Sequence, residues 1–487
     1  MNDSGSALHD LDSNLRGSLL LPGEPAYAVR SKLASARNQR HPLAIAQCTG
    51  VADVVNTIQF ARGQGIDFTV LAGGHELDGW GLQDGVLALD LTPMNGVLVD
   101  PRGRRGVVQA GSRLGIMDRE TAVHGLAVTG GTVSDTGVAG LTLGGGIGWL
   151  VRRHGATLDN VTAIDAVTVE GDLVRASAED NPDLFWAMRG GGGNFAVATS
   201  FELDLHPMSP TILAGSVIHS AADAPAFLRH YREFMLDAPD DVGGMAILLR
   251  ANGPDVPADR HGELICVTIL VYTGDLHEGE RVLAPLRSAI TPLSDTVRPQ
   301  LYTTLQQVFE GPLLSQEDRR TYQKSGFLPE MSDAYLDEAM DLMKASPVPR
   351  AGERDGTLIT ISAMGGAFLR VGEESTAMPR GGANFYWEAI ASHARVEEDE
   401  IWTGYVRDQM APRLRAHSGP RAYLNHNSLD DDAAEFIPWA YGADKFARLQ
   451  KIKSQWDPHN LLRYNKNIPP EGQARPLPEA SGQTWSS

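Results

Sequence analysis

Residues 71–81 read LAGGHELDGWG, a two-glycine turn followed at once by a histidine. The turn comes after the short run 67–71, whose apolar residues are typical of a buried strand. Successive backbone N–H groups in such a turn form a concave nest that suits a pyrophosphate, and His75 would be held beside the bound group. Taken alone, however, Gly-Gly-His is more often a turn with an incidental histidine.

The flanking segments predict alternating strands and helices. Residues 43–71 read as strand, helix and strand, because apolar residues between the two strands recur at helical spacing from a start near Thr49. Gly63 and Gly65 would end this helix. Further strands are expected at 86–91, 106–110 and 195–205, a hairpin at 161–178, and helices at 113–123 and from Pro182.

Residues 126–149 follow neither periodicity. The segment LAVTGGTVSDTGVAGLTLGGGIGW carries a single formal charge, at Asp135. It is too rich in glycine for a stable free helix and too apolar for an exposed linker. Buried backbone of this kind needs hydrogen-bond partners, and a ligand could supply them.

The pattern of strand-like and helical segments changes after Pro207. Residues 208–420 contain several strand-like runs, among them 245–250, 264–272, 357–363 and 384–390, mixed with helices near 279–289, 332–345 and 397–415. This pattern predicts an antiparallel sheet with helices on one side.

Composition and missing motifs exclude several classes of function. The chain has 61 acidic and 42 basic residues and a net charge of −19, so it lacks the cationic surface that nucleic acid requires. There is no P-loop, no nucleophile elbow and no spacing typical of metal ligands. Gly191–Ala196 matches G-x-G-x-x-A, but a helix precedes it and a strand follows, the reverse of the dinucleotide-binding order.

Other features bear on the compartment. Two cysteines far apart in the sequence, Cys48 and Cys266, are expected to be buried free thiols, which suits a reducing compartment. The N-terminus has no signal-peptide pattern, and the most apolar stretch, 264–272, is about half the ~18 residues of a membrane span. We expect a cytoplasmic protein that binds neither membrane nor nucleic acid.

Six motifs in a fixed order change the interpretation of His75. They are GGH (73–75), GGTVSDTGVAGLTLGGGIGW (130–149), TLDN (157–160), PDLFWAMRGGGGNFAVATSFEL (182–203), YLNH (423–426) and DPHNLLRYNKNIPP (457–470). The succession resembles the vanillyl-alcohol-oxidase-type FAD-binding superfamily, in particular its berberine-bridge-enzyme-like branch with bacterial nicotine oxidases and antibiotic-pathway relatives. The resemblance covers about 41–205 and 421–470.

The resemblance implies an α+β fold. A two-lobed FAD-binding domain of the PCMH type would comprise 1–206 and 430–487, and an antiparallel sheet-and-helix substrate domain would comprise 207–429. It also implies an FAD-dependent oxidase that oxidises a small organic substrate, such as an alcohol, an amine or a phenolic or polyketide-like molecule, by two electrons and passes them to O2.

The cofactor contacts implied by the resemblance can be placed on this sequence. His75 would bind FAD covalently, as the single attachment, because Val133 stands where many relatives carry a second, cysteinyl link. The other contacts would come from the pyrophosphate cradle (Ala72, Gly73, Gly74), the flavin lining (Gly131, Gly137, Gly140, Leu141), the adenine end (Val197) and the isoalloxazine edge (Asn465).

Three residues are implied on the reaction side. Tyr423 would accept the substrate proton if neighbouring cations lowered its pKa, and His426 would bind or orient the substrate. Thr136 stands where relatives place a residue that gates oxygen access. Each of the three could instead be purely structural. Tyr386 and Glu388, two apart on a probable strand, would share a face and could line the same cavity.

Other departures and alternatives stay open. Leu71 replaces an arginine common in relatives, and Glu76 replaces a serine or asparagine. An oxidative cyclase or flavin-dependent oxygenase of natural-product biosynthesis keeps the same fold. A flavin- or ligand-binding protein without turnover is a third possibility. The substrate and the oligomeric state do not follow from the sequence, and no metal is expected.

Overall fold

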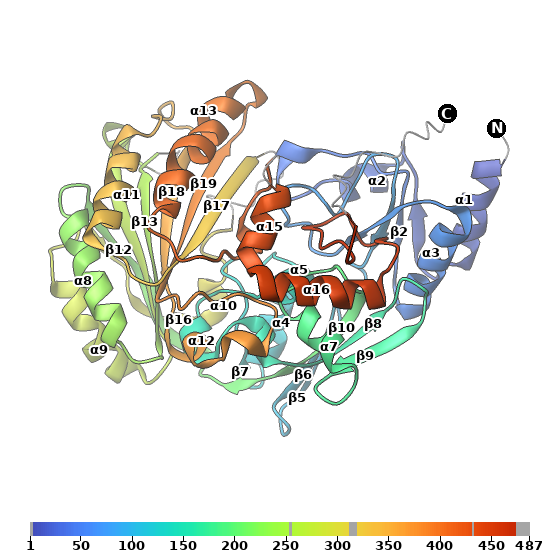
Figure 1. The fold of residues 1–487 in the computed structure, drawn as a ribbon. Helices are drawn as coiled ribbons and strands as arrows, with labels where there is room; N and C mark the ends of the chain where they lie inside the picture. The colour runs from blue at the N-terminus through green and yellow to red at the C-terminus, as the bar shows by residue number, and fades with distance from the viewer. Residues whose placement is uncertain (1–2, 253–255, 311–318, 431–432, 474–487) are drawn as a thin grey trace.

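Two lobes lie side by side in the computed structural model, which describes residues 3–252, 256–310, 319–430 and 433–473 (Figure 1). The first lobe holds β1–β11 and the second holds β12–β19. Residues 1–2, 431–432 and 474–487 of the predicted FAD-binding domain lie outside the described residues. The expected α+β class is confirmed, because helices accompany both a mixed sheet and antiparallel sheets.

A four-stranded sheet begins the first lobe. It has the order β1-β2-β4-β3, in which β2, β4 and β3 run parallel, and it consists of β1 (Ser18–Leu20), β2 (Ala44–Gln47), β3 (Phe68–Leu71) and β4 (Leu87–Asp90). Helix α3 (Val51–Gln64) connects β2 to β3, as expected, and ends at Gly65, whose φ is +66°. Its N-cap is Gly50 rather than Thr49, because the Thr49 N–H and hydroxyl both donate to Asp53 within the first turn.

An antiparallel five-stranded sheet completes this lobe, in the order β5-β6-β10-β8-β9. Its strands are β5 (Val97–Asp100), β6 (Arg105–Gln109), β8 (Val161–Val167), β9 (Leu173–Ser177) and β10 (Val197–Asp204). The expected helices are present as α4 (Leu114–Ala122) and α7 (Pro182–Met188). Residues 191–196 therefore lie between a helix and a strand, which confirms that they are no dinucleotide fingerprint.

The glycine-rich segment 126–149 differs from expectation, because part of it is helical. Helix α5 (Val138–Gly144) buries Val138, Ala139 and Leu143 in the core of the first lobe. Tertiary packing therefore overrides the low helix propensity of its glycines. The helix ends where Gly145 and Gly146 adopt φ values of 154° and 89°.

The second lobe is built on one antiparallel sheet, as expected. Its order is β15-β12-β14-β13-β18-β19-β17, and β16 also pairs with β12. The strands are β12 (Thr211–Ser220), β13 (Val242–Arg250), β14 (Leu264–Tyr272), β15 (Ser294–Asp295), β16 (Arg298–Leu301), β17 (Arg320–Leu328), β18 (Gly356–Ala363) and β19 (Phe385–His393).

Helices cover the face of this sheet that points away from the first lobe (Figure 1). They are α8 (Ala224–Asp237), α9 (Leu276–Ser288), α11 (Asp333–Ala345), α13 (Asp399–Gly404) and α14 (Ala411–Arg415). The remaining α-helices and strands of the described residues are α1 (Asp3–Asn14), α2 (Pro25–Arg30), β7 (Leu126–Ala127), α6 (Val151–His154), β11 (His206–Pro207), α10 (Tyr302–Leu305), α12 (Gly366–Arg370), α15 (Ala433–Tyr441) and α16 (Ala443–Trp456). Helix α16 returns to the first lobe and contacts α7.

Strand β13 shows how the large sheet joins the two lobes. Ala246 and Leu248 pack in the cluster under the helices, whereas Met245 and Ile247 join a cluster that includes Trp149 of the first lobe. Because side chains alternate along a strand, the sheet is apolar on both faces. Its inner face therefore forms one wall between the lobes.

Cys48 and Cys266 are buried and free, as expected. Among the described residues, no helix has the length and apolarity needed to cross a bilayer. The same residues contain no cluster of three or more His, Cys, Asp or Glu side chains that could hold a metal ion.

Candidate active site

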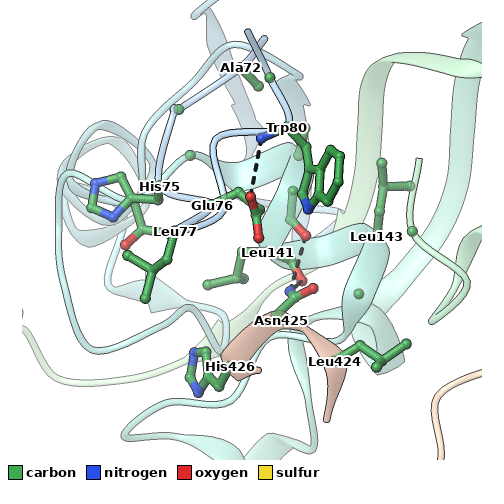
Figure 2. A pocket seen from close by; sticks show the side chains of 18 of the residues that line it. Ala72, His75, Glu76, Leu77, Trp80, Leu141, Leu143, Leu424, Asn425 and His426 are labelled. Atoms are coloured by element: carbon green, nitrogen blue, oxygen red, sulfur yellow. Dashed lines mark hydrogen bonds between the residues drawn. The ribbon is translucent and has the colours of Figure 1, made fainter. Parts of the chain in front are cut away.

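A cleft with a cavity volume of about 380 Å³ lies between the lobes, within the usual size range of small-molecule sites. Figure 2 shows part of its lining. The first lobe contributes the loops around 71–77, 131–144, 190–198 and 462–466, and strands of the second lobe form the opposite wall. The cofactor-side and reaction-side residues expected from the sequence line this cleft: Ala72, Gly73, Gly74, His75, Gly131, Thr136, Gly137, Gly140, Leu141, Val197, Tyr423, His426 and Asn465.

The Gly-Gly-His turn packs directly against the start of α5. A Cβ on Gly73 would lie 2.3 Å from the Gly137 nitrogen, and a Cβ on Gly137 would lie 2.5 Å from the Gly73 Cα. Both positions therefore require glycine, because backbone approaches backbone. This contact holds His75 next to the residues that precede Gly137.

His75 forms an ion pair across this contact. Its Nε2 lies 2.9 Å from Oδ1 of Asp135, and Arg113 lies 3.6 Å from the other carboxylate oxygen. Burial alone would raise the pKa of Asp135, but His75 and Arg113 outweigh it and hold that pKa below its usual value. Asp135 is therefore a carboxylate that can accept the Nε2–H of the imidazole.

Two glycines leave room for a ligand. A Cβ built on Gly140 or on Gly193 meets no atom within 4 Å, although both residues line the cleft. The space beside them is a cradle that any side chain would begin to fill. Together with the nest at Gly73 and Gly74, this lining fits an elongated cofactor with a phosphate-bearing middle, such as FAD.

Glu76 connects the N- and C-terminal parts of the cleft. One carboxylate oxygen accepts from the N–H groups of Asp78 and Trp80, and the other lies 2.9 Å from the Lys466 ammonium (Figure 2 shows the Trp80 bond). The unusual glutamate at this position thus joins segments 390 residues apart. Beside it, the Asn465 amide donates to the Gly193 carbonyl.

A fully buried ion pair supports the same C-terminal segment. The Lys453 ammonium lies 2.6 Å from Asp457, and both side chains are 0% exposed. Lys453 also donates to the carbonyls of Asn194 and Leu462, while Asp457 accepts from the N–H of Leu461. The pair therefore positions the 190–194 loop and the 461–466 segment together.

Tyr423 is held in an environment different from the one expected. Its hydroxyl accepts from the Gly146 N–H at 2.9 Å and from the Asn425 amide at 3.0 Å. Asn425 also donates to the Gly140 carbonyl, which links the 423–426 segment to α5. Burial raises the pKa of Tyr423 to about 12, although the two hydrogen bonds oppose this rise. The shift is opposite to the one that a proton acceptor requires.

The second titratable pair in the cleft is Glu388 with His426. Nδ1 of His426 lies 2.7 Å from Oε1 of Glu388, which also receives a bond from Gln323, and Thr360 donates to Oε2 at 2.9 Å. Burial would raise the pKa of Glu388, but His426, Thr360 and Gln323 lower it below its usual value. Because the carboxylate lies next to Nδ1, Nε2 is the ring nitrogen more available to a bound molecule.

The rest of the second lobe's wall is partly apolar. The other strand residues that line the cleft there are the apolar Met245, Ile247, Leu358 and Ile390, with Phe309 close to them, and the polar Thr321, Gln323 and Thr360. Tyr386, expected to share the cavity with Glu388, lines a smaller adjoining pocket with it. Such a wall accommodates an apolar body and places one ionised carboxylate and one imidazole against it.

Sequence reasoning did not identify several of these residues. Gln323 and Thr360 carry no motif, and only the register of β17, β18 and β19 brings them to Glu388. Asp135 and Asn425 lie inside quoted motifs, but their partners could not be inferred from spacing. The partner of Lys466 could not be inferred from spacing either.

Comparisons with known proteins agree with this geometry. A family model described as "FAD binding domain" matches residues 42–177, and one described as "Berberine and berberine like" matches 422–469. (R)-6-hydroxynicotine oxidase of Paenarthrobacter nicotinovorans is 28% identical over 469 residues, which cover 94% of this chain and 98% of the relative. Xylooligosaccharide oxidase of Thermothelomyces thermophilus is 36% identical over 174 residues, 35% of either chain.

Solved structures show the same architecture. The crystal structure of 6-hydroxy-D-nicotine oxidase from Arthrobacter nicotinovorans has a TM-score of 0.83 at 25% identity and covers 94% of this chain and 98% of that one. Physcomitrella patens BBE-like 1 has a TM-score of 0.82 at 21% identity, with 97% and 99% covered, and shares the fold.

Proposed function

The chain belongs to the FAD-linked oxidases of the vanillyl-alcohol-oxidase superfamily, in its berberine-bridge-enzyme-like branch, and on this premise we propose that its FAD is attached covalently and solely to His75. The protein is thus an FAD-dependent oxidoreductase. It oxidises a small organic substrate by two electrons and passes them to O2, which becomes H2O2.

The observation that carries the attachment is the position of His75. It lies at the end of the Gly73–Gly74 nest, inside the cleft, in contact range of Asp135. A neutral imidazole is a nucleophile, and the methyl carbon on C8 of oxidised flavin is an electrophile. Val133, which lines the same cleft, has no nucleophilic atom, so one bond is expected rather than two.

The protein positions FAD with backbone more than with side chains. Ala72, Gly73 and Gly74 would hold the pyrophosphate, and Gly131, Gly137, Gly140 and Leu141 would leave room for the flavin. Val197 would contact the adenine end, and Asn465 would lie at the isoalloxazine edge. When bound, the flavin supplies the capacity to accept a hydride and to reduce O2.

The substrate side is formed by His426, Glu388 and Tyr423. Nε2 of His426 accepts the proton of a substrate O–H or N–H group, and Glu388 stabilises the imidazolium that results. Tyr423 orients the substrate through its hydroxyl rather than taking the proton, because its raised pKa disfavours the phenolate. The short side chain of Thr136 keeps a path open for O2.

The side chains of the second lobe that line the cleft indicate which class of substrate it can bind. Four apolar strand residues of the second lobe line the cleft together with the Glu388 carboxylate, whose oxygens accept from Gln323 and Thr360, so this wall suits an amine or alcohol with an apolar or aromatic body. A relative named (R)-6-hydroxynicotine oxidase is consistent with such a molecule.

Acid precipitation tests the attachment. Wild-type protein should keep its yellow colour in the pellet, His75→Ala should lose it, and His426→Ala, the matched histidine control, should keep it. Free flavin in the wild-type supernatant would contradict covalent attachment.

Oxygen consumption tests the reaction. Amines and alcohols with apolar bodies are compared with oligosaccharides, and one H2O2 is expected per substrate oxidised. Label from ¹⁸O2 appearing in the organic product would instead indicate an oxygenase, and a cyclised product would indicate an oxidative cyclase. Bound flavin that no substrate reduces would favour a protein without turnover.

A further inference from the structure

Asp135 is the one charged side chain in the segment 126–149, and it faces the histidine proposed to bind flavin. Its loop is fixed on two sides. The carbonyls of Ser134 and Thr136 accept from the N–H groups of Gly115 and Leu114, and Ser134 N–H donates to the Gln306 carbonyl. Asp135 is therefore held in place by backbone rather than by its own contact with His75.

The two ring nitrogens of His75 have different surroundings and therefore different roles. Nε2 of His75 lies 2.9 Å from Oδ1 of Asp135, an ion-pair distance. Because an ionised carboxylate accepts but cannot donate, it favours the ring tautomer that has its proton on Nε2. The lone pair is then on Nδ1, which is the nucleophilic nitrogen.

We propose that Asp135 is the positioning residue for flavin attachment: it sets the tautomer of His75 so that Nδ1 forms the bond, and it stabilises the positive charge that the ring acquires. This inference rests on the proposed covalent link to His75. It assigns a role to a residue outside the motif positions that the resemblance implies for the cofactor.

The step balances with groups already named. Nδ1 forms a bond to the methyl carbon on C8 of the flavin, and that methyl group loses one proton. The imidazole, transiently cationic beside Asp135, gives up its Nε2 proton. The two electrons released reduce the flavin ring, which takes up two protons. O2, already the acceptor in the proposed reaction, then reoxidises the ring and forms H2O2.

Arg113 provides an internal comparison. It lies 3.6 Å from the second oxygen of Asp135 and is half exposed, so it contributes a screened attraction rather than a defined hydrogen bond. Removing Arg113 should change attachment far less than removing the carboxylate. Arg113→Ala is therefore the matched control.

The experiment follows covalent flavin against time. Protein prepared without flavin is mixed with FAD, samples are denatured with acid, and flavin fluorescence is measured on the polypeptide band; FAD bound before denaturation is measured separately by gel filtration. Asp135→Asn should bind FAD but attach it roughly 10- to 100-fold more slowly, because a hydrogen bond to a charged group is lost. Arg113→Ala should attach it within about three-fold of the wild-type rate.

The outcomes separate the two proposals. No covalent flavin on wild-type protein refutes the proposed attachment itself. Covalent wild-type flavin together with an unchanged rate in Asp135→Asn overturns only the role of Asp135. If Asp135→Asn does not bind FAD, formate is added to Asp135→Ala: restored attachment supports the carboxylate's role, and no restoration overturns it.

Discussion

Gly140 offers a sharp test of where the flavin lies. It is the third residue of α5, it is exposed in the cleft, and a Cβ there meets nothing within 4 Å. Replacement by leucine should therefore leave the cofactor-free protein folded. A helix interior even gains about 0.5–1 kcal/mol when glycine is replaced by a better helix former.

The Gly140→Leu substitution should be unfavourable only when FAD binds. If the isoalloxazine ring occupies the space beside Gly140, a leucine side chain must be accommodated against it. Overpacking of this kind costs about 1–3 kcal/mol of binding free energy, which corresponds to a roughly 5- to 150-fold higher dissociation constant for FAD. The mutation should therefore separate stability, which is unchanged or raised, from cofactor affinity, which falls.

The assay uses a His75→Ala background so that binding stays reversible, and quenching of flavin fluorescence gives the dissociation constant. Gly63→Leu is the matched control, because Gly63 is also an exposed helical glycine with no atom within 4 Å of its Cβ, but it does not line the cleft. Equal FAD affinity of the Gly140 and Gly63 variants, with both folded, would show that the flavin does not lie over α5.

Three further predictions concern buried charges. Glu388→Gln should lower kcat in oxygen-consumption assays roughly 10- to 100-fold with unchanged flavin content, and turnover equal to wild type would contradict its role. Lys453→Met should lower the free energy of unfolding by about 3–5 kcal/mol by leaving Asp457 unpaired, and the double variant with Asp457→Leu should recover much of that loss in thermal denaturation. Burial raises the pKa of Asp118 to about 7, so the folded state binds this proton more tightly than the unfolded chain, and wild-type stability falls as pH rises from about 4 to 7. Asp118→Asn should lack that component of the fall, so an identical pH dependence of the melting temperature in both proteins would refute it.

The sequence predicted what local spacing determines. The strand–helix–strand unit at 43–71 and four strands of the second lobe, β13, β14, β18 and β19, follow from apolar periodicity, because each buries one or both faces in a core. The cofactor-side residues could be proposed from the sequence because their glycines and His75 lie in compact motifs. The first motif is a turn after β3, and the other residues lie in a loop with the start of α5, at the start of β10 and in the segment after α16; all of them line one cleft.

The partners of these residues could not be predicted, because tertiary contacts determine them. Helix α5 forms only when Val138 and Leu143 are buried by the rest of the first lobe. The proposed role of Tyr423 depended on neighbouring cations, whereas the fold surrounds its hydroxyl with neutral donors from Gly146 and Asn425. Environment, which a motif does not encode, sets the direction of that pKa.

The two histidine–carboxylate pairs in the cleft are expected to have separate functions, one toward the cofactor and one toward the substrate. In each pair a carboxylate with a lowered pKa lies within ion-pair distance of one ring nitrogen: Asp135 is next to Nε2 of His75, and Glu388 is next to Nδ1 of His426. The side chain of Glu388 is 9% exposed and that of Asp135 34%, so the Glu388 pair is less screened and its loss should have the larger effect.

The pairs share no residue, so their functions should separate. Asp135→Asn, once its flavin is attached, should be reduced by substrate at the wild-type rate in anaerobic stopped-flow measurements. Glu388→Gln should attach flavin normally yet be reduced slowly. If either variant showed both defects, the two pairs would form one coupled network rather than one device for the cofactor and another for the substrate.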